Sequence, residues 1–597
     1  MPPGQSFGKM KISSKTEKPK DTKYVFKRLW YYIYQYKLLF LLALILTIVS
    51  NILAIIGPML SGYAIDAIEP GKGSVVFKTV FYYAGWMVLF YVASSILSYI
   101  LSVLMIHLSQ KIVRKMREDV FHKLVDLPIS YFDTNQAGDI ISRISYDIDT
   151  VNTSMSTDVI QIAAGLITVI GSLIMMIIIS PVLVLVMFVT IPLSVLYTRF
   201  MSKRIKPLFR KRSAKLGEMN GFIEEMVSGQ KTINAYGAED EILKRFDKIN
   251  KETVDAYYDA EYYGSLMGPT VNFINNISLT LITIAGAILY LLSHMSLGNI
   301  SSFIQYSRKF SGPISEVANV VSELQSAAAA AERVFKLIDE EAELMDKEDA
   351  IDLNMVHGDV SLHNVSFGYI PEKTIIKSLS LKAKSGSLTA IVGATGAGKT
   401  TIINLLMRFY DIWEGSIYLD DKEIRDITRK SLRKSYTMVL QDTWLFEGTV
   451  FDNIAYGKEN ATKEEVEEVA KMTGIHSFIK RLPNGYDTII NENGINISKG
   501  QKQLLTIARA MLLDSQMLIL DEATSNVDTR TEIKIQKAMR KLMEQKTCFV
   551  IAHRLSTIQG ADNILVVDQG NVIEQGNHIE LMEKKGFYYQ LYQSQFE

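Results

Sequence analysis

The chain has little cysteine and no net charge. Its 597 residues include one cysteine, Cys548, which excludes an intramolecular disulfide. Because 64 basic residues balance 64 acidic ones, the composition predicts no nucleic-acid partner, which would need an excess of positive charge in patches. Residues 1–28 form a basic leader that lacks the apolar core of a signal peptide.

Charged residues are also missing from long stretches of the first half. Residues 38–65, 79–106, 159–198 and 262–293 contain none, and a bilayer span needs about 20 such residues. Residues 297–324 form a weaker apolar stretch that includes charges. We therefore expect a domain of six transmembrane helices over residues 29–325, and all six should span the lipid bilayer. The predicted spans lie near 38–65, 76–106, 159–179, 182–199, 264–293 and 297–324.

The basic residues predict how these spans are oriented. Residues 1–28, ahead of the first span, carry eight lysines and arginines, whereas Lys72 and Lys78 are the basic residues between the charge-free stretches 38–65 and 79–106. Since cytoplasmic loops carry the excess of positive charge, we expect a multi-pass protein of the cytoplasmic membrane with both termini in the cytoplasm. The inner connections are long and show helical periodicity, so the helices should extend into the cytoplasm. Two segments of these connections, residues 131–149 and 229–241, contain turn formers and from composition alone are helix ends.

A soluble domain is predicted from residue 356 to residue 597. It follows an alanine-rich and then acidic segment, residues 326–355, that is typical of a helix tail and linker. Short β-rich runs alternate with helical stretches, which predicts a mostly parallel sheet covered by helices. The β-rich runs are VSLHNVSFGY, LTAIVG, MLILDEA, TCFVIAH and NILVVD. The fold class is thus an all-α membrane domain fused to an α/β domain that has a helical subdomain.

A phosphate-binding loop opens this soluble domain. The run LTAIVGATGAGKTT at residues 388–401 matches G-x-x-x-x-G-K-[ST] between a predicted strand and a predicted helix. Glycines let backbone N–H groups face phosphate oxygens, Lys399 reaches the terminal phosphates, and Thr400 offers a hydroxyl to Mg²⁺. The chain should therefore bind a nucleoside triphosphate together with Mg²⁺. The predicted contacts are Gly393, Ala394, Thr395, Gly396, Ala397, Gly398, Lys399, Thr400 and Thr401.

Three further residues follow buried strands and suit hydrolysis. Asp521 and Glu522 end the apolar run MLILDE, and His553 ends FVIAH. Asp521 is expected to act on the metal, and Glu522 to polarise the attacking water. His553 is a candidate for contacting the γ-phosphate, although a histidine in a core would look the same.

The order of these motifs resembles that of the ATP-binding cassette (ABC) half-transporters of the exporter type, with the type IV membrane fold, over nearly the whole chain. The resemblance implies that Tyr369 stacks on adenine, that Gln441 senses the γ-phosphate and the metal, and that residues 525–528, ending in Asp528, form the D-loop. Glu492 would lie near the coupling helices. By the same resemblance, the segments at 131–149 and 229–241 contain these coupling helices, which replaces the composition-based interpretation.

The signature motif departs from the family pattern. The family usually has L-S-G-G-Q, and this chain has I-S-K-G-Q, with Ser498, Lys499, Gly500 and Gln501. In the family the signature of one chain contacts ATP held by a partner chain. Lysine places a side chain and a charge where backbone should approach phosphate, so the site should bind ATP and hydrolyse it poorly. We therefore expect a heterodimer with a second half-transporter of a bacterial exporter, and a homodimer is the alternative.

The sequence leaves the transported substance open. Drug, lipid and peptide export all fit apolar spans, and an ATP-regulated channel or sensor would keep every motif. Ionisable residues at membrane depth often mark functional sites, so Arg308 and Glu316 are the preferred candidates for lining a substrate cavity. The polar candidates in the spans are Asn51, Asn272, Asn275, Asn276, Arg308, Glu316 and Asn319.

Overall fold

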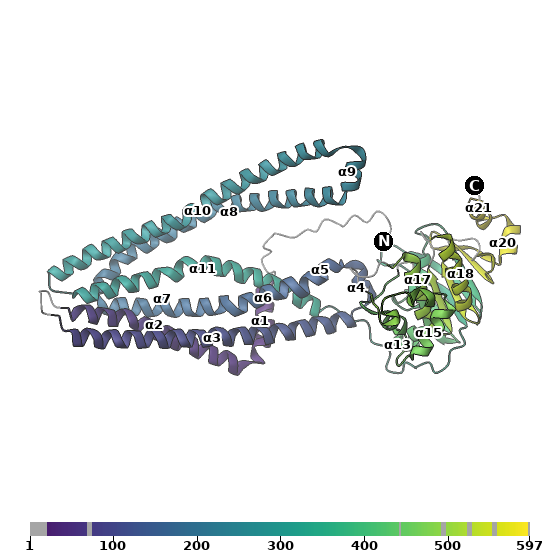
Figure 1. Cartoon of the computed structure of the whole chain (residues 1–597), viewed down its shortest axis with the longest axis horizontal. Coiled ribbons are helices and arrows are strands. Elements are labelled where there is room, and N and C mark those ends of the chain that lie inside the picture. The colour runs from purple at the N-terminus through teal and green to yellow at the C-terminus, as the bar shows by residue number, and fades with distance from the viewer. Residues whose placement is uncertain are drawn as a thin grey trace. The chain divides into compact units, whose positions relative to one another are not determined.

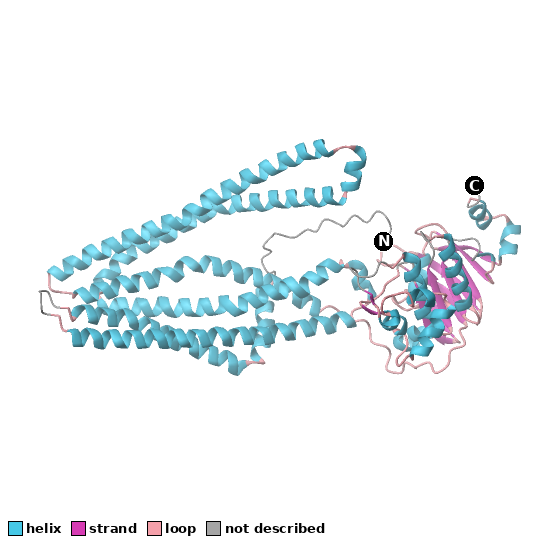
Figure 2. Ribbon diagram, viewed as in Figure 1, coloured by secondary structure: helices cyan, strands magenta, loops and turns pink. Residues whose placement is uncertain are grey.

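The structure is a computed structural model that describes residues 21–68, 75–440, 443–490, 497–521, 528–551 and 558–594 (Figure 1). The chain divides into two compact units. A helical unit holds the described residues up to Leu127 together with Asn135–Glu341, and the second unit holds Pro128–Thr134 and the residues from Ala342 onward. Figure 2 shows the strands gathered in the second unit. The division after Glu341 falls within residues 326–355, which stay a predicted helix tail and linker.

The helical unit consists of long helices, as expected where apolar side chains dominate and the backbone must bond internally. Two turns of π-helix, η1 (Arg143–Asp147) and η2 (Ser154–Asp158), lie between its shorter helices. The α-helices are α1 (Thr22–Tyr34), α2 (Lys37–Asp66), α3 (Phe77–Asp126), α5 (Ala137–Ser142), α6 (Ile148–Thr153), α7 (Val159–Ile179), α8 (Pro181–Ser228), α9 (Gln230–Tyr236), α10 (Glu239–Leu291) and α11 (Leu297–Ile338).

Four helical runs of the described residues are long and apolar enough to cross a membrane. They are Lys37–Asp66, Phe77–Asp126, Ala137–Ile179 and Glu239–Leu291. The predicted spans 182–199 and 297–324 lie in α8 and α11, where membrane crossing stays a prediction.

The long helices α8 and α10 pair along their length and are joined by the short helix α9. Figure 1 shows the pair diverging from α2, α3, α7 and α11 toward α9. Arg212 of α8 forms an ion pair with Glu261 of α10 at 2.5 Å, and Lys215 forms one with Glu252 at 2.6 Å. The two helices are therefore held together by charges at the end near α9.

The second unit contains a six-stranded sheet in the order β12-β11-β3-β10-β9-β6, parallel except for the edge strand β12. This confirms the predicted mostly parallel sheet. Its strands are β3 (Leu388–Val392), β6 (Tyr436–Val439), β9 (Met517–Asp521), β10 (Thr547–Ile551), β11 (Asn563–Asp568) and β12 (Asn571–Gly576).

The run VSLHNVSFGY does not join that sheet, so this part of the prediction is wrong. It forms β1 in a separate antiparallel sheet of order β2-β1-β4-β5. Several positions along β1 and β2 are exposed, as in antiparallel sheets that are covered on one face. The strands are β1 (Val360–Phe367), β2 (Ile376–Ala383), β4 (Glu414–Leu419), β5 (Lys422–Glu423), and a separate pair β7 (Gly448–Thr449) and β8 (Ile489–Ile490).

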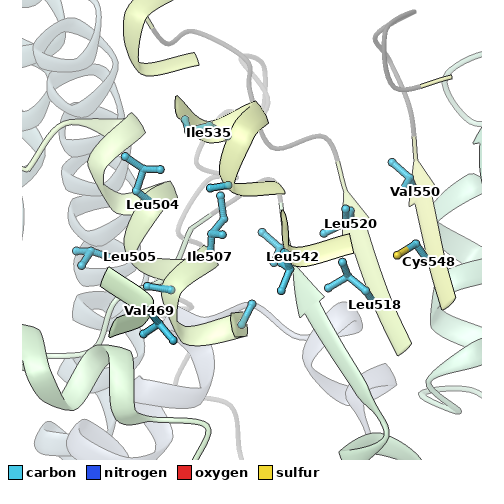
Figure 3. Close-up of a cluster of buried hydrophobic side chains, with 14 of the residues drawn as sticks. Val469, Leu504, Leu505, Ile507, Leu518, Leu520, Ile535, Leu542, Cys548 and Val550 are labelled. Carbon is cyan, nitrogen blue, oxygen red and sulfur yellow. The ribbon is translucent and has the colours of Figure 1, made fainter. Parts of the chain in front are cut away.

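Helices pack on the parallel sheet and enclose an apolar core. Figure 3 shows this core, in which Leu504 and Ile507 of α17 belong to the same buried cluster as Leu518 and Leu520 of β9. The helices between β6 and β9 make up the predicted helical subdomain. The helices of the unit are α4 (Ile129–Thr134), α12 (Lys399–Leu406), α13 (Arg429–Lys434), α14 (Val450–Ala455), α15 (Lys463–Met472), α16 (His476–Ile479), α17 (Lys499–Leu513), α18 (Thr529–Met543), α20 (His578–Lys584) and α21 (Phe587–Gln593), with 3₁₀ turns η3 (Ile424–Asp426) and η4 (Gly485–Asp487).

Candidate functional site: a nucleotide-binding loop and the start of a second helix

The predicted phosphate loop lies between β3 and α12, at the carboxyl edge of the parallel sheet. Gly398 has a φ of 107° and precedes the first residue of α12, Lys399. A Cβ on Gly393 would lie 2.1 Å from the carbonyl oxygen of Val567, so only glycine lets the loop approach β11 this closely. The first N–H groups of α12 lie next to this loop, the arrangement by which helix N-termini bind phosphate.

Lys399 is buried, with 7% of its surface exposed, and its side chain curls back over the loop. Its ammonium Nζ donates to the carbonyl oxygens of Gly393 at 2.8 Å and Ala394 at 3.0 Å. A cation held inside a ring of backbone fits a phosphate group in the loop. A Cβ on Gly396 would meet nothing within 4 Å, so the loop is open at that point. The hydroxyl-bearing Thr400 is exposed beside it.

Tyr369 is held at its hydroxyl and half-exposed at its ring. The hydroxyl donates to Oγ1 of Thr401 at 3.2 Å and accepts from Nδ2 of Asn404 at 3.1 Å. The rings of Phe367 and Tyr410 lie edge-on, with centroids 5.2 Å and 4.9 Å from that of Tyr369. With 45% of its surface exposed, the Tyr369 ring is positioned to stack on a flat base, and α12 ties it to the phosphate loop.

Asp521 ends β9 at the same edge of the sheet. Ile551 of β10 pairs with Asp521 on one side and with Ile391 of β3 on the other, so Asp521 lies level with the residues that enter the phosphate loop. Hydroxyl and carboxylate oxygens such as those of Thr400 and Asp521 are ligands that Mg²⁺ prefers. Among the described residues there is no group of three or more acidic, histidine or cysteine side chains that could hold a metal ion.

Several predicted residues lie outside the described residues. These are Gln441, Glu522, His553, Glu492 and residues 525–527. In the sequence, Glu522 directly follows β9 and His553 follows β10 by two residues. Asp528 is described, and its carboxylate caps α18 by accepting from the Thr531 N–H at 3.0 Å. This hydrogen bond lowers the pKa of Asp528.

The signature motif begins the helix α17, and Ser498 is its N-cap. The hydroxyl of Ser498 accepts from the Gln501 N–H at 3.3 Å, and the Gln501 side chain accepts from the Ser498 N–H at 2.9 Å, which forms a capping box. Ile497 and Gly500 are buried, whereas Ser498 and Lys499 are exposed. The start of α17 thus presents an exposed lysine on the surface.

One inner segment packs with the nucleotide-binding unit. The hydroxyl of Tyr410 donates to Oδ2 of Asp133 in α4 at 2.5 Å. Burial, together with this bond, raises the pKa of Tyr410. Because the Tyr410 ring also contacts Tyr369, α4 is connected to the residue expected to hold the base. Tyr410 was not among the residues predicted from the sequence, since its partner lies 277 residues away.

The polar residues of the predicted spans are placed unequally. Arg308, Asn272 and Asn276 are exposed, and Asn275 is half-buried. Asn51 is partly buried and accepts a hydrogen bond from Thr168 at 3.2 Å. The side chains of Glu316 and Asn319 lie outside the described residues. Lys309, which sequence reasoning did not select, is partly buried against α2.

Two family models match the chain: the ABC transporter transmembrane region over residues 40–314 and the ABC transporter over residues 376–525. The fatty acid ABC transporter ATP-binding/permease protein of Mycobacterium tuberculosis is 42% identical over 88% of this chain and 83% of its own length. The ATP-dependent lipid A-core flippase of Escherichia coli is 34% identical over 97% of this chain and 99% of its own.

A solved structure of a bacterial Atm1-family ABC exporter with ATP bound is also similar, with a TM-score of 0.75 and 29% identity over 94% of this chain and 98% of that chain. The phosphate loop and the apolar helices described above lie within the two matched regions. The chain therefore belongs to the ABC transporters, as an exporter half-transporter whose ATPase unit is coupled to movement of a substance across a membrane.

Proposed function

We propose that the chain uses ATP to export a lipid or fatty-acid-like molecule across the cytoplasmic membrane by alternating access. The observation that carries this proposal is a complete phosphate loop in the same chain as long apolar helices that include few charged groups. Two similar proteins are named for fatty acids and for lipid A-core. An acyl chain fits helices that are rich in leucine, isoleucine and aromatic residues.

The basic residues and α1 support an inward-facing N-terminus. The helix α1 carries Lys23, Lys27 and Arg28, and its aromatic residues Trp30 and Tyr31 are exposed. Such a helix lies in the interface between lipid and water. Arg28 also pairs with Asp339, just beyond the end of α11. The inner end of α11 would then lie at the cytoplasmic surface.

Within the ATPase unit, different residues bind the parts of ATP and promote its hydrolysis. Lys399 and the loop amides hold the phosphates, Tyr369 holds the base, and Thr400 and Asp521 hold Mg²⁺, which neutralises charge on the phosphates when bound. Glu522, next to Asp521 in sequence, polarises the attacking water. Closure of the site would be transmitted through short inner helices such as α4, which bonds to Tyr410.

A second half-transporter supplies the other half of each nucleotide site. The exposed start of α17 has Lys499 where backbone should meet phosphate, which favours a heterodimer with one slow site. Tyr236 of α9 is 83% exposed, and the ATPase unit exposes Trp444 and Tyr456. Apolar surface of this kind on the tip of α8 and α10 and on the ATPase unit is consistent with contacts to a partner chain.

The test is lipid transport in sealed vesicles that contain the assembled transporter, purified from its own cells through a tag on this chain. ATP should drive labelled fatty acid or phospholipid to the opposite leaflet, and a non-hydrolysable analogue should not. The Lys399→Ala variant is the control, because it removes the phosphate cation. Movement that continues at the wild-type rate with the analogue would favour an ATP-regulated channel.

Mass spectrometry of the same purified material tests the assembly. A second half-transporter in equal amount supports the heterodimer. Recovery of this chain alone, with full ATPase activity, would replace it with a homodimer.

A further inference from the structure

Lys309 is a cation in the middle of a predicted membrane span. It lies on α11, about 18 Å of helix from the start at Leu297. Its side chain is partly buried, and its Nζ donates to the carbonyl oxygen of Ala54 in α2 at 3.0 Å. An ionisable residue at this depth is costly and marks a functional site unless its surroundings account for it.

The proline of α2 accounts for one of its hydrogen bonds. Pro58 has no N–H, so the carbonyl of Ala54, four residues earlier, lacks its helical donor, and Lys309 supplies one. Ser302 and Tyr306 of α11 donate nearby, to Pro58 O at 2.8 Å and Ile55 O at 2.7 Å. This contact uses one of the three N–H groups of the ammonium and does not require its charge.

The charge itself has no carboxylate partner in the part of the chain that the structure describes. The acidic residue of α2, Asp66, lies at the far end of that helix from Lys37 and accepts from the Gly298 N–H and the Ser296 hydroxyl, each at 2.7 Å. No ion pair joins any described acidic side chain to Lys309. A positive charge with two remaining N–H groups in an apolar region attracts an anion.

Polar groups from two other helices lie at the same level. A Cβ on Gly165 of α7 would lie 3.3 Å from Pro313, and one on Gly171 would lie 2.5 Å from Ile55, whose carbonyl bonds to Tyr306. These contacts make α7 and α11 antiparallel, so Thr168 of α7 is level with Lys309. Thr168 in turn donates to Asn51 of α2 at 3.2 Å.

An apolar cluster adjoins this polar layer. It contains Ile55 together with Phe303, Tyr306 and Phe310, and it extends to Met295 near the start of α11. Lys309 therefore lies beside apolar side chains along the side of α11 that faces α2 and α7. The combination of one cation and neutral polar groups beside a buried apolar core suits the headgroup of an amphipathic anion.

We propose that Lys309, with the amide of Asn51 that the hydrogen bond from Thr168 orients, binds the anionic headgroup of an acyl-chain substrate, a carboxylate or a phosphate. This inference rests on the proposed export of lipid-like molecules and adds the chemical class of the headgroup. The adjacent Arg308 is exposed and takes no part.

Photocrosslinking measures binding directly. The assembled transporter, in phosphatidylcholine nanodiscs without nucleotide, is labelled with a photoreactive palmitate, and palmitate, phosphatidylglycerol or hexadecanol competes. Lys309→Gln keeps a donor for Ala54 and loses the charge, Lys309→Arg keeps the charge, and Arg308→Gln is the matched control. Hydrogen bonds to charged groups predict that Lys309→Gln weakens palmitate binding by about tenfold or more. Hexadecanol binding and thermal stability should not change, and Lys309→Arg should retain palmitate binding.

The competitors identify the source of the anion. Displacement by palmitate alone assigns a carboxylate, and equal displacement by phosphatidylglycerol assigns a lipid phosphate. Unchanged palmitate binding in Lys309→Gln, or an equal loss in Arg308→Gln, overturns the inference. If palmitate binding depends on Lys309 but ATP moves no lipid in vesicles, the headgroup site is supported and the proposed export function is wrong. If ATP moves lipid in vesicles but palmitate binding does not depend on Lys309, the proposed export function is supported and the proposed headgroup site is wrong.

Discussion

The hydrogen bond between Tyr410 and Asp133 can be removed without disturbing the nucleotide site. Tyr410→Phe deletes one oxygen and keeps the ring that lies 4.9 Å from the Tyr369 ring. Asp133→Ala deletes the acceptor on α4. Because α4 lies in one of the inner segments expected to contain a coupling helix, we predict that both changes reduce coupling between transport and ATP hydrolysis.

The solvent exposure of the Tyr410–Asp133 pair determines how large the loss of coupling should be. A hydrogen bond to a carboxylate contributes about 1.5 to 3 kcal/mol when it is shielded from water. Asp133 is exposed, so solvent screening reduces this to about 1 kcal/mol, which corresponds to roughly a fivefold effect. The KM for ATP should not change, since Tyr369 keeps its bonds to Thr401 and Asn404.

The assay is the ratio of lipid-stimulated to basal ATPase activity in the wild type, the two single variants and the double variant. Each single change should lower the ratio by up to about fivefold, and the double variant should be no worse than either single one, because all three lose the same bond. Asp139→Ala in α5 is the control, since Asp139 is also exposed and has no side-chain partner among the described residues. A double variant whose loss equals the product of the two single losses would refute the coupling, and so would an equal loss in Asp139→Ala.

Three other changes test separate parts of the molecule. Lys499→Gly should raise ATP turnover of the assembled transporter severalfold, and an unchanged rate would show that the lysine is tolerated. Burial raises the pKa of Cys548 to about 12, so native protein at pH 8 should resist N-ethylmaleimide, as followed by mass spectrometry, and react once unfolded. The thiol contributes to stability below about pH 8.5, and this contribution is lost as the pH rises toward 12. Gly298→Ala should destabilise the helical unit by about 1 to 3 kcal/mol in thermal unfolding, because its Cβ would lie 2.0 Å from the Gly62 carbonyl oxygen, whereas Gly312→Ala meets nothing and should be neutral.

Local chemistry made the nucleotide-binding unit predictable. A glycine loop between a strand and a helix needs only neighbouring residues, and β3 and α12 flank the loop as expected. The cap at Ser498 is equally local, because its partner Gln501 is three residues away. The family resemblance supplied the roles of Tyr369 and the signature, which composition and spacing did not.

Contacts between residues that are distant in the sequence could not be predicted from the sequence. The strand β1 was expected in the parallel sheet, but its pairing with β2 and β4 depends on side-chain burial that its own sequence does not reveal. Arg308 and Lys309 are adjacent, and about 100° of helix rotation separates them. Only the position of Pro58 on another helix decides which of the two meets an unpaired carbonyl. The sequence favoured Arg308, and the structure places that residue on an exposed face.

The bonds between helices indicate which parts of the helical unit move together. Between α2 and α11, hydrogen bonds occur at the outer end, through Asp66, and in the middle, through Tyr306 and Lys309. Several bonds of about 1 kcal/mol each, added to tight packing at Gly298, make these two helices one body. Ion pairs such as Arg212 to Glu261 make α8 and α10 another. The short connections that join α7 to α8 and α10 to α11 are then the places where backbone angles must change during transport. Because Lys309 lies inside the first body, its position relative to α2 stays fixed while the second body moves.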